Sequence, residues 1–217
     1  MANTKISGLT ALTSTSDDDL VVIVDDPSGS PVTKKMTVAN LKTSLGSPLG
    51  KQDLWIPASA MWARTTNGAG GLSKTETATN YVNYQTFDFD TTTQEFVQFS
   101  WSPPRNYNNG TVTFTPYWTA ASGSGTVVFS LKGVAISNDD PLEVAFGTEQ
   151  TSTDTLITAV DVHIGPRSSA ITIAGTPADS DYIHFQIARN VADDTLGVDA
   201  KLLGIVLEYT IDAGIAA

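Results

Sequence analysis

Apolar and polar residues alternate with a period of two along most of the chain after residue 84. Such alternation is typical of strands that bury one face in a core and leave the other in water. With the stretches 55–62 and 170–174 added, about nine candidate strands result, which predicts an all-β fold, a jelly-roll-like antiparallel β-sandwich over residues 51–217. The apolar members of the alternation are Phe87, Phe89, Val97, Phe99, Trp101, Val112, Phe114, Trp118, Val127, Phe129, Leu131, Leu156, Val160, Val162, Ile164, Ile183, Phe185, Ile187, Leu203, Ile205, Leu207, Tyr209 and Ile211.

The segments between these strands carry turn chemistry. Asn109-Gly110 predicts a tight hairpin, because both residues tolerate positive φ. Residues 64–80 form a long polar connection without a strand or helix pattern, and such connections are usually functional or make contacts between subunits. Residues 139–150 and 191–200 are each compatible with a short helix or an irregular loop.

The first 46 residues have a pattern of their own. Residues 20–24 are a continuous aliphatic run between acidic turns, which predicts a strand, and residues 31–36 can return as its hairpin partner. Thr37 stands at an N-cap position before Val38, Leu41 and Leu45, which follow at helical spacing up to Gly46. We therefore expect a small hairpin-plus-helix module over residues 1–46, a linker over 47–50, and the sandwich after it.

This N-terminal module has little to bury. All 18 aromatic residues of the chain lie after residue 50. A segment of this size with small aliphatic side chains alone usually needs a partner to fold. The alternative is an unstructured leader; we prefer a module that oligomerises or docks on something larger. Its candidate anchoring residues are Ile6, Leu9, Leu12, Leu20, Val22, Val24, Val38 and Leu41.

Three motifs in this order, residues 5–12, 18–25 and 34–41, resemble the leader of many tailed-bacteriophage virion proteins, tail fibres and tailspikes in particular. In that family the leader tethers the polypeptide to the particle. The resemblance implies a non-enzymatic virion structural protein, made in the bacterial cytoplasm without a signal peptide, in a tail fibre or tail tip that contacts the host. A head-decoration or head-fibre protein is the second hypothesis, and a free carbohydrate-binding module is the third.

Association with further copies is expected on two grounds. Phage fibres and spikes are usually trimeric, so the resemblance implies a homotrimer that also binds other virion proteins. Independently, Phe96, Val128, Leu202 and Val206 place apolar side chains on the second face of their strands. Monomers seldom tolerate large exposed apolar patches, so a symmetric neighbour is expected to cover this face.

The charge balance excludes two classes of partner. The formal net charge is −11, and binding to nucleic acid or to an anionic membrane rewards clustered basic charge instead. No apolar run approaches the ~18 residues of a membrane span. The first five residues lack the apolar core of a secretion signal.

The sequence contains no recognisable catalytic motif. The chain has no cysteine and two histidines, His163 and His184, without ligand spacing or a nucleophile elbow. Pairs of aspartates could serve a glycosidase, and Asp193, Asp194 and Asp199 could give oxygens to calcium. Turn formation is the ordinary explanation of these aspartates. We expect no enzyme, no catalytic residue, no metal and no cofactor.

Two polar loops are the candidate recognition surfaces. The first holds Arg64 and Asn67, and the second holds Arg105, Tyr107 and Asn108. Tyrosine, asparagine and arginine are adaptable contact groups. If the protein touches a host cell-surface glycan, these loops are expected to do so.

Overall fold

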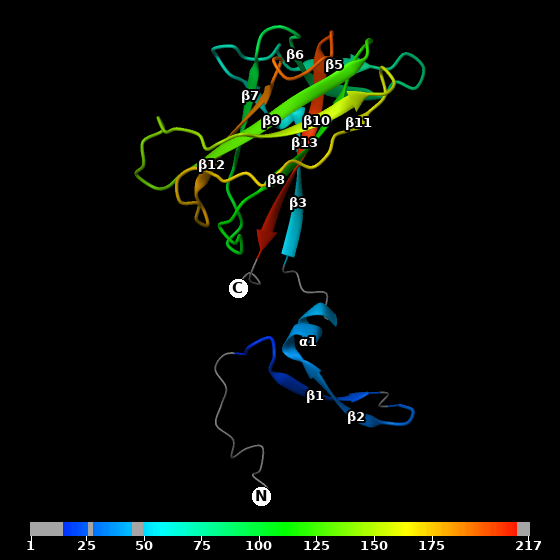
Figure 1. Cartoon of the computed structure of the whole chain (residues 1–217), viewed down its shortest axis with the longest axis vertical. Helices are drawn as coiled ribbons and strands as arrows, with labels where there is room; N and C mark the ends of the chain where they lie inside the picture. The colour runs from blue at the N-terminus through cyan, green and yellow to red at the C-terminus, as the bar shows by residue number, and fades with distance from the viewer. Residues whose placement is uncertain (1–14, 26–27, 45–49, 212–217) are drawn as a thin grey trace, which may run out of the picture. The chain divides into compact units, whose positions relative to one another are not determined.

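The computed structural model describes residues 15–25, 28–44 and 50–211. The chain divides into two compact units, residues 1–48 and residues 49–217 (Figure 1). Within the described residues, no helix is long and apolar enough to cross a membrane.

The N-terminal unit is a hairpin followed by a short helix, as the sequence predicts. Strand β1 (Leu20–Asp25) pairs antiparallel with β2 (Val32–Thr37), and α1 (Val38–Ser44) follows directly. The Asn40 backbone N–H donates to the Thr37 hydroxyl at 3.2 Å, so Thr37 caps the helix. Lys42 pairs with Asp17 at 2.7 Å and ties the helix to the segment before β1.

This unit buries few side chains. Of its described candidate anchors, Val38 is buried and Leu41 is half-buried. Leu20, Val22 and Val24 are 57%, 70% and 56% exposed, whereas Val21 and Ile23 between them are half-buried. Candidate anchors Ile6, Leu9 and Leu12 lie outside the described residues.

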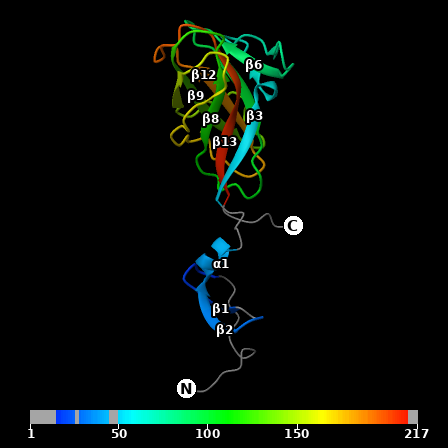
Figure 2. The ribbon, with the colours of Figure 1, turned by 90° about the vertical axis from the view of Figure 1, so that its right-hand side faces the viewer.

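The second unit consists of two antiparallel sheets, which confirms the all-β prediction (Figures 1 and 2). One sheet has five strands, in the order β10 (Gln150–Leu156), β9 (Gly125–Ile136), β12 (Tyr182–Arg189), β7 (Phe96–Trp101) and β4 (Trp62–Ala63). The other has six, in the order β11 (His163–Ile164), β8 (Thr113–Thr119), β13 (Ala200–Ile211), β6 (Asn83–Phe89) and β5 (Ser73–Glu76), with β3 (Gly50–Pro57) also on β13. A single 3-10 turn, η2 (Ala58–Ala60), separates β3 from β4.

The core lies between the two sheets and combines aliphatic side chains with several aromatic rings. Phe99 and Phe185 stack with ring centroids 5.0 Å apart, and Phe89 meets Phe129 edge-on at 5.7 Å. Trp101 and Trp118 are 8% and 0% exposed, so both lie in the interior as expected. Period-two alternation therefore assigned these strand faces correctly.

The hairpin predicted at Asn109-Gly110 is wrong. Asn109 does adopt a positive φ of 58°. The flanking strands β7 and β8, however, belong to different sheets, so this connection crosses from one sheet to the other. A turn residue fixes the local backbone but not the sheet that receives the next strand.

The stripe from Leu156 to Ile164 is also corrected. Leu156 is buried at the end of β10, whereas Val160, Val162 and Ile164 are 66%, 63% and 58% exposed. The chain leaves β10 after Leu156 and only residues 163–164 pair again, as β11. The apolar residues at every second position therefore continue beyond the end of β10, where they no longer mark a buried strand face.

Three smaller predictions change as well, and the choice between helix and irregular loop in two segments is resolved. Strand β5 lies inside the polar stretch 64–80, and residues 170–174 make isolated bridges rather than a strand. The segments 139–150 and 191–200 contain no helix. In β13 the register shifts between Leu202 and Gly204, so Leu202 is buried and Leu203 lies on the outer face.

Candidate functional site

Four polar or aromatic side chains form one row across the outer face of the five-stranded sheet. Trp62 of β4 pairs with Gln98 of β7, Gln98 with Gln186 of β12, and Gln186 with Lys132 of β9. Their neighbours in sequence point inward, because Val97, Phe99, Phe185, Ile187 and Leu131 all belong to the core. The alternation that builds the core therefore places these four side chains together on the outside.

Hydrogen bonds hold the two amides of this row in place. Gln98 Nε2 donates to Gln186 Oε1 at 3.1 Å, and Arg64 Nη1 donates to the same oxygen at 3.3 Å. The Arg64 guanidinium also lies over the Phe96 ring, 3.7 Å from its centroid. Gln186 is buried beneath these partners, and Gln98 is oriented by it.

Aromatic rings gather around His184, which lies two residues before Gln186 on the same face of β12. The His184 ring centroid lies 5.7 Å from that of Trp62, 5.8 Å from that of Tyr182 and 6.0 Å from that of Phe146. Desolvation by burial lowers the pKa of His184 below its ordinary 6.5. The imidazole is therefore neutral at neutral pH, and one of its nitrogens can donate a hydrogen bond while the other accepts.

A groove of about 310 Å³ lies over Gln98, Tyr182 and His184, and the Trp62 ring lies beside it against His184. Val134, Ile136, Leu142, Val144 and Phe146 line it with apolar surface, and Gln98, Tyr182 and His184 contribute its polar atoms. Trp62 and Tyr182 are 42% and 43% exposed. No carboxylate is among these lining residues, and Asp139 and Asp140 line a separate hollow that shares Ile136, Leu142 and Tyr182 with the groove. Ring faces, fixed amides and a neutral imidazole can bind a molecule with apolar faces and hydroxyl edges.

The predicted recognition residues divide between the two ends of β7. Arg64 reaches the row through Gln186, and the Asn67 carbonyl accepts the Phe96 N–H at 2.9 Å at the start of β7. Arg105 and Asn108 are exposed in the loop that follows Trp101, at the end of that strand. The structure therefore does not combine them into one site.

Tyr107 is not a surface residue, and this corrects the prediction. It is 3% exposed, with its ring centroid 5.2 Å from that of Trp101 and 6.2 Å from that of Tyr209. Its hydroxyl donates to the Gly110 carbonyl, and burial raises the pKa of Tyr107 to about 12. The ring closes one end of the core and cannot stack on a ligand.

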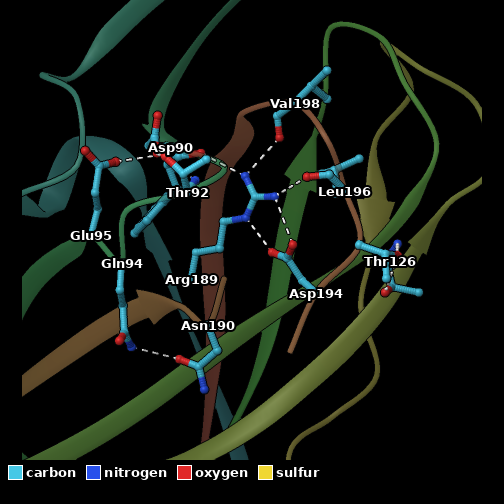
Figure 3. Close-up of polar contacts among 12 residues, drawn as sticks. Asp90, Thr92, Gln94, Glu95, Thr126, Arg189, Asn190, Asp194, Leu196 and Val198 are labelled. Carbon is cyan, nitrogen blue, oxygen red and sulfur yellow. Dashed lines mark hydrogen bonds and ion pairs between the residues drawn. The ribbon is translucent and has the colours of Figure 1, made fainter. Parts of the chain in front are cut away.

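The aspartates have structural partners. Asp194 accepts two hydrogen bonds from Arg189, and Asp88 pairs with Lys201 (Figure 3 shows the Arg189 cluster). Asp90 accepts the N–H groups of Thr92 and Thr93 at 2.7 Å each, and these bonds lower the pKa of Asp90 to about 2. Among the described residues, no three His, Cys, Asp or Glu side chains gather as metal ligands.

His163 is buried as well, with 7% of its surface exposed. One ring nitrogen lies 2.9 Å from the Thr158 carbonyl, and the ring centroid is 4.9 Å from that of Trp118. The His163 side chain is therefore used in contacts inside the sandwich, with the Thr158 carbonyl and the Trp118 ring.

Sequence reasoning missed the row and the groove. Gln98 and Gln186 occupy polar positions of two alternating strands, which is the signal available in the sequence. That signal does not indicate which strands are neighbours in the sheet. The four residues of the row, at positions 62, 98, 132 and 186, are far apart in the sequence and meet only through strand pairing.

No family model matches the sequence, and no curated protein matches it. The fold is similar to solved carbohydrate-binding modules. A family 11 module from Clostridium thermocellum, solved with a β-1,3-1,4-mixed-linked tetrasaccharide, is 12% identical with a TM-score of 0.41, covering 77% of this chain and 100% of that one. A module specific for non-crystalline cellulose, CBM28, is 14% identical with a TM-score of 0.37, covering 70% and 85%. A family 61 module solved with β-1,4-galactotriose is 13% identical with a TM-score of 0.31, covering 74% and 88%. At such TM-scores the ligands of these modules are not transferred to this chain.

Proposed function

We propose that the β-sandwich is a non-catalytic carbohydrate-binding module that binds a glycan across the outer face of its five-stranded sheet. The observation that carries this proposal is the row Trp62–Gln98–Gln186–Lys132, with His184 and Tyr182 beside it. Trp62 and Tyr182 offer exposed ring faces at two points of the face. A glycan chain that runs from the groove past His184 to Trp62 would place sugar rings against these faces.

The polar groups suit hydroxyl recognition. Each sugar hydroxyl both donates and accepts, and the Gln98 amide and the neutral His184 imidazole also do both. Gln98 is already oriented by its bond to Gln186, so little side-chain freedom is lost when a ligand binds. Lys132 and Arg64 add donors beside Gln186.

Calorimetric titration of the full chain with bacterial surface polysaccharides and plant β-glucans tests this proposal. Trp62→Ala is expected to weaken binding by about tenfold or more, because it removes an exposed stacking face. Trp55→Ala is the matched control, since Trp55 is 46% exposed on the other sheet and Trp62 is 42% exposed. Equal loss in both variants, or no binding to any glycan by the wild type, would overturn the proposal.

The second candidate function is that of a phage virion structural protein in which this module contacts the host surface. The observation that favours it is the N-terminal unit, where Leu20, Val22 and Val24 expose one apolar face of β1. Such a face suits attachment to a larger body, as in the leaders that residues 5–41 resemble. A tail-fibre protein would lie on the tail of the particle and a head-decoration protein on its head, and cryo-electron microscopy of the particle distinguishes the two.

A further inference from the structure

The outer face of the six-stranded sheet carries an exposed apolar surface of a different character. We call it the apolar strip and define it by Trp55, Tyr84, Tyr117, Val160, Val162 and Leu203. These residues line two adjoining hollows of about 340 and 140 Å³, and Tyr84 and Leu203 line both. The strip is therefore continuous from β3 across β13 and β6 to the segment before β11.

The two rings at one end of the strip are held firmly. The Trp55 and Tyr117 centroids lie 5.0 Å apart in an edge-on contact. The Trp55 indole also lies against the backbone of Gly204, where an added β-carbon would meet ring atoms at 2.7 and 2.8 Å. Trp55 stays 46% exposed although its position is fixed, so it presents a rigid apolar surface to a partner.

The aliphatic end of the strip is more exposed still. Val160 and Val162 are 66% and 63% exposed, and Val82 beside them in the smaller hollow is 57% exposed. Ile164 pairs with Tyr117 and continues the same face at 58% exposure. Aliphatic groups of this kind offer a sugar neither a flat ring nor a hydrogen bond. They are typical of protein interfaces.

Five charged groups on or beside this face are paired with one another. Lys201 pairs with Asp88 at one end of the strip, and Glu208 pairs with Lys51 and Arg167 beyond the other end. The whole chain has a formal charge of −11, so two copies repel over most of their surfaces. An apolar face flanked by ion pairs lowers that repulsion where two copies meet.

We propose that the apolar strip is a self-association surface and packs against the same strip of a second copy of this chain. Contact between like faces needs no other protein and closes by symmetry. It leaves the row on the five-stranded sheet free, so self-association would multiply the glycan contacts of one assembly. The inference stands independently of the glycan proposal.

Sedimentation equilibrium of the full chain over micromolar concentrations tests this. Wild-type protein is expected to associate, and Val162→Glu is expected to return it to the chain mass of 22.9 kDa. Val162 is mostly exposed, so this change is compatible with folding, and Val82→Glu is a second variant of the same kind. Leu142→Glu is the control for association alone, because Leu142 is 81% exposed and lines the groove on the other sheet.

Three results would overturn the proposal. The first is a wild-type protein that sediments at 22.9 kDa throughout. The second is association that survives both Val162→Glu and Val82→Glu, since contacts elsewhere would then hold the copies together. The third is loss of glycan binding without loss of association in these variants, which would make the strip a ligand site instead. Failure of glycan binding by the wild type leaves the first two readouts unaffected.

Discussion

Arg189 and Asp194 form a buried ion pair at the end of β12. Arg189 Nε lies 2.5 Å from Asp194 Oδ2, and the side chains are 0% and 4% exposed. The remaining guanidinium donors reach the carbonyls of Phe89, Leu196 and Val198, so one side chain ties β6 and the 191–199 loop to β12 (Figure 3).

Asp194→Asn is therefore expected to destabilise the fold strongly. Loss of one partner leaves a buried guanidinium without its counter-charge, which typically costs about 3–5 kcal/mol. Urea unfolding followed by fluorescence measures the change. The neighbouring exposed Asp193→Asn is the control, and equal stability of the two variants would show that the pair is not a structural lock.

Trp118 supplies a second stability prediction. It is 0% exposed, and its indole N–H donates to Asp154 Oδ2 at 2.8 Å. Trp118→Ala is expected to cost about 3–5 kcal/mol in thermal or urea unfolding. Trp62→Ala, on the outer face, should cost less than about 1 kcal/mol. The reverse order would mean that the faces of β8 and β4 are assigned wrongly.

His184 makes the stability depend on pH. Burial lowers the pKa of His184 in the folded protein, whereas the unfolded chain titrates near 6.5. Between these two pKa values the unfolded chain binds more protons, so stability rises with pH. The contribution of neutral His184 is full above pH 6.5 and is lost as the pH falls through the lower, folded pKa.

Comparison of wild type with His184→Gln isolates this effect from that of the carboxylates. The free energy of unfolding of the wild type should fall more steeply below pH 6.5 than that of the variant. Proton NMR of the imidazole gives the folded pKa directly. A value at or above 6.5 would refute the prediction.

Removal of residues 1–46 tests the role of the N-terminal unit. The division of the chain at residue 48 leads us to expect a soluble, folded sandwich. If the unit attaches the protein to a virion, the truncated chain should be missing from purified particles. Gel analysis and electron microscopy measure its presence, and wild-type incorporation would contradict the attachment role.

The sequence predicted which face of a strand is buried better than it predicted which strands pair with each other. Alternation placed Phe99 and Phe185 in the core, because period-two burial is a local property of a strand. It failed at Leu203, where a register shift reverses the faces, and at Val160, where pairing had already ended. The Thr37 cap was predictable because its partner lies three residues away.

The candidate site depends on contacts between distant residues. Gln98 meets Gln186 only because β12 returns beside β7, and nothing near either glutamine in sequence indicates this. Arg64 was singled out from its polar loop, yet its role beside Gln186 depends on the same pairing. The prediction that Tyr107 is a surface residue was wrong. Its neighbours in sequence are polar, which is typical of an exposed loop, but the Tyr107 ring packs into the core.

The central claim is that glycan binds over Trp62 and Gln98 on the five-stranded sheet. NMR titration with a polysaccharide that the protein binds tests it most directly, by following the side-chain N–H signals of the tryptophans and glutamines. We expect the Trp62 indole and the Gln98 amide to shift with ligand while the Trp55 indole stays unchanged. A shift of the Trp55 signal, with those of Trp62 and Gln98 unmoved, would contradict the account.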